Sequence, residues 1–209
     1  RVTDASRREI VGSNTVRVTR QRYYVYLRPE HSIYQPNDKV QINVKSIDAN
    51  KQPLPAEGLI KVTRDYWVEI RVDADGKEIR IDGQRSNPRT PGKLKSRGYQ
   101  HEEIVSQIVK TGADGEAEVT FTPAKEGFYR VAWTSEQDDG PPIGAETTIH
   151  VATDKTTESG YHYGGVQIIA DKDTFAAGQS AAVMISVPTS NRYVLFTVEG
   201  DDLYQYLLV

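Results

Sequence analysis

The stretch Tyr34-Gln-Pro-Asn-Asp-Lys-Val-Gln-Ile-Asn-Val44 decides the fold, because it joins a bend to the start of a half-buried strand. An aromatic residue closes one segment, the Pro-Asn pair makes the bend, and apolar residues then alternate with polar ones. A weaker copy, Phe175-Ala-Ala-Gly-Gln-Ser-Ala-Ala-Val-Met-Ile-Ser-Val187, begins 141 residues later. The same spacing relates Val25 and Leu27 to Val166 and Ile168. A repeat of this length is too long for a solenoid unit and predicts the beginnings of two successive domains.

Alternation of apolar and polar residues predicts short strands along most of the chain. We expect strands at 23–27, 39–47, 58–63, 66–72, 77–81, 104–110, 117–122, 128–134, 145–151, 182–187 and 193–199. Asp-Gly pairs at 75–76, 82–83 and 114–115 tolerate the positive φ that tight hairpins need. No segment shows a sustained helical period. An antiparallel two-sheet sandwich follows, because a lone sheet would leave one apolar face in water.

The order of these strands predicts four parts. We expect 1–20 to hold the closing strands of a preceding domain, and 21–152 to form a complete sandwich centred on Trp133, Phe121 and Tyr129. The polar, Gly-rich segment 153–165 is typical of a linker, and 166–209 predicts the N-terminal part of a further sandwich. We therefore expect the sequence to belong to a longer polypeptide.

Composition excludes several classes of function. The formal charge of −3 argues against nucleic acid as the main partner, since phosphate binding needs clustered Lys and Arg. Zero cysteines exclude disulfides, thiolate metal sites and a Cys nucleophile within these residues. No stretch approaches the roughly 20 apolar residues of a membrane span.

Three ordered motifs carry a family resemblance. They are the bend at 34–44, Asp114-Gly-Glu-Ala-Glu-Val-Thr-Phe-Thr-Pro123, and Glu126-Gly-Phe-Tyr-Arg-Val131. In this order they resemble a macroglobulin domain of the alpha-2-macroglobulin family, and Pro188 with 194–199 resembles the start of the next one. The resemblance spans nearly the whole chain and is greatest for the bacterial branch, whose large exported inhibitors are strings of such immunoglobulin- or fibronectin-like sandwiches.

The resemblance implies a protease trap. In this family a protease cuts an exposed bait segment, the surrounding domains collapse, and a thioester in a separate domain can tether the protease. The thioester motif needs Cys-x-Glu-Gln, which this sequence lacks. The resemblance therefore implies non-catalytic structural domains of an extracytoplasmic endopeptidase inhibitor, with neighbouring macroglobulin domains as direct partners, proteases as partners of the full-length parent, and no cofactor.

The most unusual local composition lies at 83–100, which has basic but no acidic side chains. Its basic residues are Arg85, Arg89, Lys93, Lys95 and Arg97. Prolines and glycines disfavour regular structure across much of it, and exposed irregular segments are where proteases cut. The functional hypothesis is a protease-exposed or partner-contacting loop, and the simpler one is a long solvated loop between two strands. The family's bait segment belongs to a later domain, which favours the simpler interpretation.

Motifs for metal binding and catalysis are incomplete. Asp73, Asp75 and Glu78 begin like a calcium loop but lack its other ligands, so a hairpin turn is favoured. The four histidines, His31, His101, His150 and His162, have no i, i+4 spacing, so we expect no zinc site. Ser180 lacks the second glycine of a nucleophile elbow. The adjacent Glu102 and Glu103 would point to opposite faces of a strand.

Two other classes of function need the same sandwiches. One is a tandem module of a surface adhesin or stalk. The other is a carbohydrate-binding accessory module, in which Tyr23, Tyr24, Tyr26, Tyr161 and Tyr163 would form a sugar-stacking platform. Strand packing with wet hydroxyls is the simpler interpretation of these tyrosines. The sequence favours an enzyme least of all.

Overall fold

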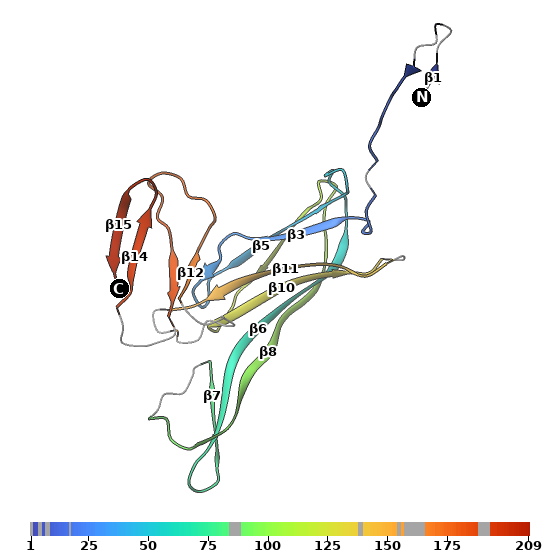
Figure 1. Cartoon of the computed structure of the whole chain (residues 1–209). Coiled ribbons are helices and arrows are strands. Elements are labelled where there is room, and N and C mark those ends of the chain that lie inside the picture. The colour runs from blue at the N-terminus through green and yellow to red at the C-terminus, as the bar shows by residue number, and fades with distance from the viewer. Residues whose placement is uncertain are drawn as a thin grey trace.

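The structure, a computed structural model, describes residues 2–3, 6, 9–16, 18–83, 89–137, 140–153, 156, 166–187 and 193–209. Its regular structure in these ranges is β-strand throughout, which confirms the all-β fold (Figure 1). No helix among these residues could cross a membrane.

Two mainly antiparallel sheets form a sandwich from β3 (Tyr24–Pro29) to β11 (Ile143–Val151), and we call this part of the chain the first unit. The smaller sheet has the order β3, β5 (Val40–Ile47) and β9 (Glu116–Phe121). The larger one has the order β4 (Ile33–Tyr34), β11, β10 (Gly127–Ser135), β6 (Glu57–Val72) and β7 (Glu78–Asp82), with β8 (Lys93–Lys110) also paired to β6. Only β4 and β11 run parallel among these pairs.

Alternate residues of both sheets fill one core, as the sequence pattern predicts. Trp133 and Tyr129 are 1% exposed and Phe121 is 7% exposed, so the three predicted central residues are buried. Valines and isoleucines of β5, β6, β9 and β11 complete the cluster. Burial of this apolar surface is the main force holding the two sheets together.

The long strand β6 corrects the expectation of two strands, 58–63 and 66–72. Arg64 and Asp65 interrupt the apolar alternation between them, which favoured a break. In the structure both side chains are buried and bonded to neighbouring strands, so the backbone continues through them without a turn.

The long strand β8 corrects the expectation of a loop over 83–100. Irregular backbone ends at Gly92, whose φ of +84° makes the turn, and residues 93–100 pair with β6. Arg71 donates to the carbonyl oxygens of Pro91 and Gly92 and so fixes this turn. The sequence 93–103 is polar because β8 is the edge strand of its sheet, where charged side chains discourage pairing with another chain.

The second unit begins after residue 165. It contains β12 (Gln167–Ala170) paired with β13 (Val183–Ser186), and β14 (Leu195–Glu199) paired with β15 (Leu203–Leu208). At the other end of the chain, β1 (Val2–Thr3) pairs with β2 (Glu9–Ile10). Assignment of 1–20 to a preceding domain, of 153–165 to a linker and of 166–209 to a macroglobulin domain remains a prediction.

The repeat seen in the sequence is also a repeat of geometry. The pair Leu27 and Val44 of β3 and β5 recurs 141 residues later as Ile168 and Ile185 of β12 and β13. The bends match as well, because Asn37 has a φ of 71° and its counterpart Gly178 has a φ of 81°.

Three hydrogen bonds around the first bend recur around the second. The bond from Asp38 N to Gln35 O recurs from Gln179 N to Ala176 O, and the bond from Glu30 N to Gln41 O recurs from Asp171 N to Ala182 O. Even the side-chain cap recurs, since Asp38 accepts from Gln35 N and Gln179 from Ala176 N. The second unit therefore starts with the same strand-bend-strand element as the first.

Candidate functional site

The most prominent feature of the first unit is an arm, which we define as residues 66–100 of β6, β7 and β8. The strand β10 pairs with β6 only as far as Asp65, so the antiparallel pair of β6 and β8 continues beyond the sandwich (Figure 1). Beyond that point β7 takes the place of β10 along β6. The arm carries eight Lys and Arg against five Asp and Glu, whereas the whole chain is negative.

The five basic residues predicted to form a contact loop do not all lie in one loop. Arg85 lies outside the described residues, and Arg89 is exposed in the turn before Gly92. Lys93, Lys95 and Arg97 lie on β8, so these three belong to a paired strand and not to a loop. Lys95 forms an ion pair with Glu78 of β7. Their contact with a partner or a protease remains a prediction.

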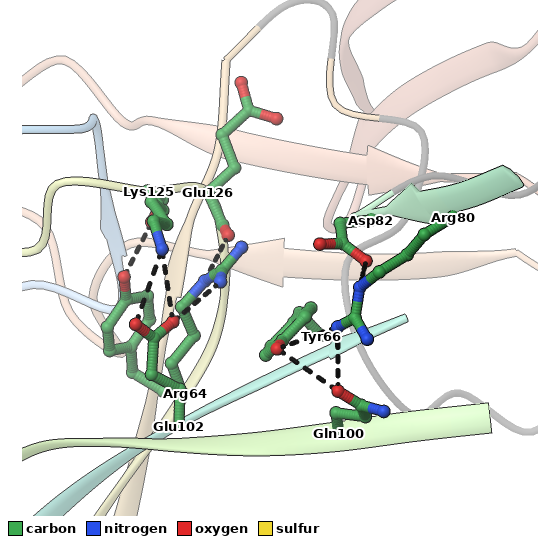
Figure 2. A network of polar contacts seen from close by, with 9 residues as sticks. Arg64, Tyr66, Arg80, Asp82, Gln100, Glu102, Lys125 and Glu126 are labelled. Atoms are coloured by element: carbon green, nitrogen blue, oxygen red, sulfur yellow. Dashed lines mark hydrogen bonds and ion pairs between the residues drawn. The ribbon is translucent and has the colours of Figure 1, made fainter. Parts of the chain in front are cut away.

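One face of the neck, where the arm leaves the sandwich, is held by Arg64. Its guanidinium donates to Glu126 O at 2.8 Å and to Glu102 Oε2 at 3.1 Å (Figure 2). Lys125 Nζ lies 3.4 Å from the other oxygen of Glu102, and Lys125 O accepts from the Tyr129 hydroxyl at 2.7 Å. The network joins β6, β8 and the turn before β10.

The pKa values of two groups in this network, Glu102 and Tyr129, are shifted from their ordinary values. Burial of the carboxyl raises the pKa of Glu102, but hydrogen bonds and positive charge from Arg64 and Lys125 outweigh burial and leave the pKa below its usual value. Burial raises the pKa of the Tyr129 hydroxyl, and the charge of Arg64 reverses only part of that effect. Glu102 is therefore held ionised and Tyr129 neutral at pH 7.

The opposite face of the neck contains a buried carboxylate, Asp65, whose side chain is 0% exposed. His101 Nδ1 lies 2.5 Å from Asp65 Oδ1, and Arg130 Nη2 donates to Asp65 Oδ2 at 2.5 Å. These contacts join β8 and β10 to β6. A carboxylate without water needs such partners, since an unpaired buried charge costs several kcal/mol, on the order of 3–5.

A pair of Asp and His also occurs in hydrolytic triads, where the second imidazole nitrogen bonds a nucleophilic hydroxyl or thiol. In the part of the chain that the structure describes, the hydrogen bond of His101 is to Asp65. The geometry therefore supports a structural role for this pair, in which His101 and the guanidinium of Arg130 both contact the buried carboxylate.

The arm itself is stiffened on both faces. On the face of Arg64, Arg80 bonds Asp82 at 2.8 Å and Gln100 at 2.8 Å beside Tyr66 (Figure 2). On the face of Asp65, Trp67 packs edge-on against Tyr99 at 5.2 Å. Its indole nitrogen donates to the buried Glu69 at 2.9 Å. Interactions among β6, β7 and β8 thus brace the arm on both faces.

The two units meet at Asp171, which directly follows β12. Its carboxylate is 10% exposed and lies 2.6 Å from His31 Nδ1. The same carboxylate accepts from Ser32 N at 3.1 Å, and the Asp171 carbonyl accepts from Ser32 N at 2.9 Å. Asp171 is the 141-residue counterpart of Glu30, so the repeat places one carboxylate of each unit beside His31.

Other residues singled out by sequence are structural. Asp73 accepts from Asp75 N and Lys77 N, and Gly76 has a φ of +82°, so the predicted hairpin turn is confirmed. Within the described residues no three His, Cys, Asp or Glu side chains are grouped as metal ligands would be. Ser180 is exposed in the segment after the second bend.

The remaining histidines, tyrosines and carboxylates are dispersed. His150 packs against Phe128 at 5.2 Å, while His162, Tyr161 and Tyr163 lie outside the described residues. Tyr23 is buried and donates to Ser135, whereas Tyr26 is 54% exposed. Glu102 and Glu103 do point to opposite faces, because Glu102 bonds Arg64 and Glu103 bonds Lys61.

Sequence reasoning missed the roles of Asp65, Asp171 and their histidines. The histidine that contacts each carboxylate is 36 or 140 residues away in the sequence, so local spacing does not reveal it. A usable signal was present at Asp65, where a charged pair interrupts an apolar alternation.

Comparison with known proteins finds distant structural likeness only. No family model matches the chain, and no curated protein matches it. The native conformation of E. coli alpha-2-macroglobulin is similar with a TM-score of 0.44 and 13% identity over 90% of this chain. The Bacillus subtilis sporulation control protein Spo0M is similar with a TM-score of 0.32 and 15% identity over 64% of the chain. A Paenibacillus cycloisomaltooligosaccharide glucanotransferase has a TM-score of 0.28 and 17% identity over 61%.

The chain spans 12%, 50% and 14% of these three proteins, respectively. At these identities and TM-scores the likeness assigns neither a family nor a function.

Proposed function

We propose that the chain is a non-catalytic structural and interaction part of a larger alpha-2-macroglobulin-like inhibitor of endopeptidases outside the cytoplasm. The observation that carries the proposal is the strand-bend-strand element repeated in the same register at Leu27–Val44 and Ile168–Ile185. It supports sandwiches arranged in series along one polypeptide. The ordered macroglobulin motifs of the sequence support the family.

The contacts at Asp171 and at the neck support a mechanical role. A trap must convert one cleavage into movement of whole domains, so its domains must transmit force without deforming. Ion pairs on both faces of β6, at Arg64 and at Asp65, fix the arm to the sandwich. The contact of His31 with Asp171 fixes the second unit to the first.

The arm supplies the contact surface in this proposal. It stands clear of the sandwich and is positively charged, so it suits an acidic surface on a neighbouring domain of the parent or on a protease. Lys93 and Arg97 are suited to this contact, because no ion pair within the described residues engages them.

Protease trapping can be tested by measuring cleavage of a large and of a small substrate in parallel. A trapped protease keeps a working active site that large substrates cannot reach. The parent polypeptide should therefore block the digestion of a protein by trypsin and leave the hydrolysis of a small peptide unchanged. The isolated chain should block neither, because it lacks Cys for a thioester. Loss of protein digestion with the isolated chain alone, or full digestion with the parent, would contradict the proposal.

A carbohydrate-binding module is a second candidate because Tyr26 is exposed. It lines a hollow of about 570 Å³ on the outer face of the smaller sheet with Arg28, Asn43 and Lys45. An aromatic ring beside polar side chains can stack on a sugar. Binding of the chain to a glycan array, abolished by Tyr26→Ala, would favour this function. A surface stalk would share the serial sandwiches and would leave protein digestion by trypsin unaffected.

A further inference from the structure

The second unit exposes the apolar face that the first unit buries. Val25 and Ile42 of the first unit are 8% and 0% exposed. Their counterparts 141 residues later, Val166 and Val183, are 59% and 38% exposed. Ile168 is 58% exposed, although its counterpart Leu27 packs against the core. The second unit thus repeats the two strands, but the apolar side chains on them are not buried as they are in the first unit.

In the first unit β9 covers the free edge of β5. Its register opposes Val119 to Ile42 and Ala117 to Val44. The bond from Ser46 N to Gly115 O fixes the alternation of this antiparallel pair, so the amides of Ile42 and Val44 also point towards β9. Val119 is 1% exposed and contributes to the core.

In the second unit the corresponding edge is open. Among the described residues β13 pairs with β12 only. By the repeat, the amides of Val183 and Ile185 point to the side that β9 occupies in the first unit. Met184 faces the other way, because its counterpart Asn43 lies in the alternating set bonded to β3. An edge with apolar side chains on one face and unpaired amides favours addition of a strand.

We propose that β13 accepts, as its antiparallel neighbour, a strand of the β9 pattern from a further part of the same larger polypeptide. The repeat defines this strand: a small residue stands opposite Ile185, a β-branched one opposite Val183, and polar residues alternate with them. This inference rests on the proposed function, because it takes the strand from the parent protein.

The test attaches the β9 sequence to the chain. Residues 112–123 are fused after Val209 through a flexible Gly/Ser linker, which raises the local strand concentration to about the millimolar range. Amide hydrogen exchange is then measured by NMR. We expect exchange at Val183 and Ile185 to slow by at least about tenfold, since each amide gains a bond. Met184 should change little and serves as an internal reference.

A matched control fusion carries Asp in place of the residues equivalent to Val119 and Phe121, and it should leave exchange at Val183 and Ile185 as fast as in the chain alone. Equal exchange in the chain and in both fusions would overturn the inference. So would dimerisation of the unfused chain with both amides already protected, because a second copy would then be the occupant. Protease trapping by the parent is measured separately, so protected amides without trapping would reject only the proposed function.

Discussion

The ring of Trp133 occupies the space that a side chain on Gly58 would need. A Cβ atom built on Gly58 would lie 2.4 Å from Cε2 of the indole, far inside van der Waals contact. Both residues lie where β6 passes beside β10, and Trp133 is 1% exposed. The absence of a side chain at 58 therefore lets the largest core residue pack closely against β6.

Gly58→Ala should lower the free energy of unfolding by about 1–3 kcal/mol, because the extra methyl group overpacks the core. Trp133→Ala alone should cost about 3–5 kcal/mol, since it leaves a cavity. In the Trp133→Ala background the cost of Gly58→Ala should largely disappear. Urea denaturation of the four proteins forms a double-mutant cycle, and strictly additive costs would contradict direct competition for space.

Asp171 should control the coupling of the two units. Asp171→Ala removes the bonds of the carboxylate to His31 and Ser32 N but keeps the bond from Ser32 N to the Asp171 carbonyl, and hydrogen bonds to a charged group contribute about 1.5–3 kcal/mol. We expect ¹⁵N relaxation to show the second unit tumbling more independently of the first. Asp171→Asn keeps one acceptor oxygen and should have a smaller effect. Asp173→Ala, two residues away and exposed, is the control; equal effects of Asp171→Ala and Asp173→Ala would refute the role of Asp171.

The sequence predicts those parts of the fold that depend on local pattern. Alternating apolar residues locate the strands of the core, and the bends at Asn37 and Gly178 follow from residues that tolerate positive φ. The repeat even predicts register, because equal spacing between bend and strand must pair Ile168 with Ile185 if it pairs Leu27 with Val44.

The neck could not be predicted in this way. Arg64 and Asp65 look like a break in β6 until Glu102, His101 and Arg130 are placed around them, and these partners lie on other strands. The strand β8 of the arm could not be predicted either. Residues 93–103 show no apolar alternation, so only pairing with β6 identifies them as a strand.

Acid should weaken the neck through Glu102. Because the fold lowers its pKa, Glu102 stabilises the folded state fully above its ordinary value of about 4.3, and this contribution is lost as the pH falls through the lowered pKa. Glu102→Gln should therefore be less stable than the parent chain at pH 7, and the difference should shrink as the pH falls below about 5. The free energy of unfolding against pH measures this, and parallel curves would contradict it.

Trypsin should distinguish the turn of the arm from its strands. Proteases cut exposed turns more readily than strands within a sheet, so cleavage should occur after the exposed Arg89 well before Lys93, Lys95 or Arg97, whose backbone is paired with β6. Brief digestion followed by mass mapping gives the order of cuts. Since β7 before the cut and β8 after it both stay paired with β6, the nicked chain should keep its sedimentation coefficient and its unfolding midpoint. A large change of shape after this single cut would instead assign bait behaviour to the arm, because only a segment under tension releases its neighbours when it is severed.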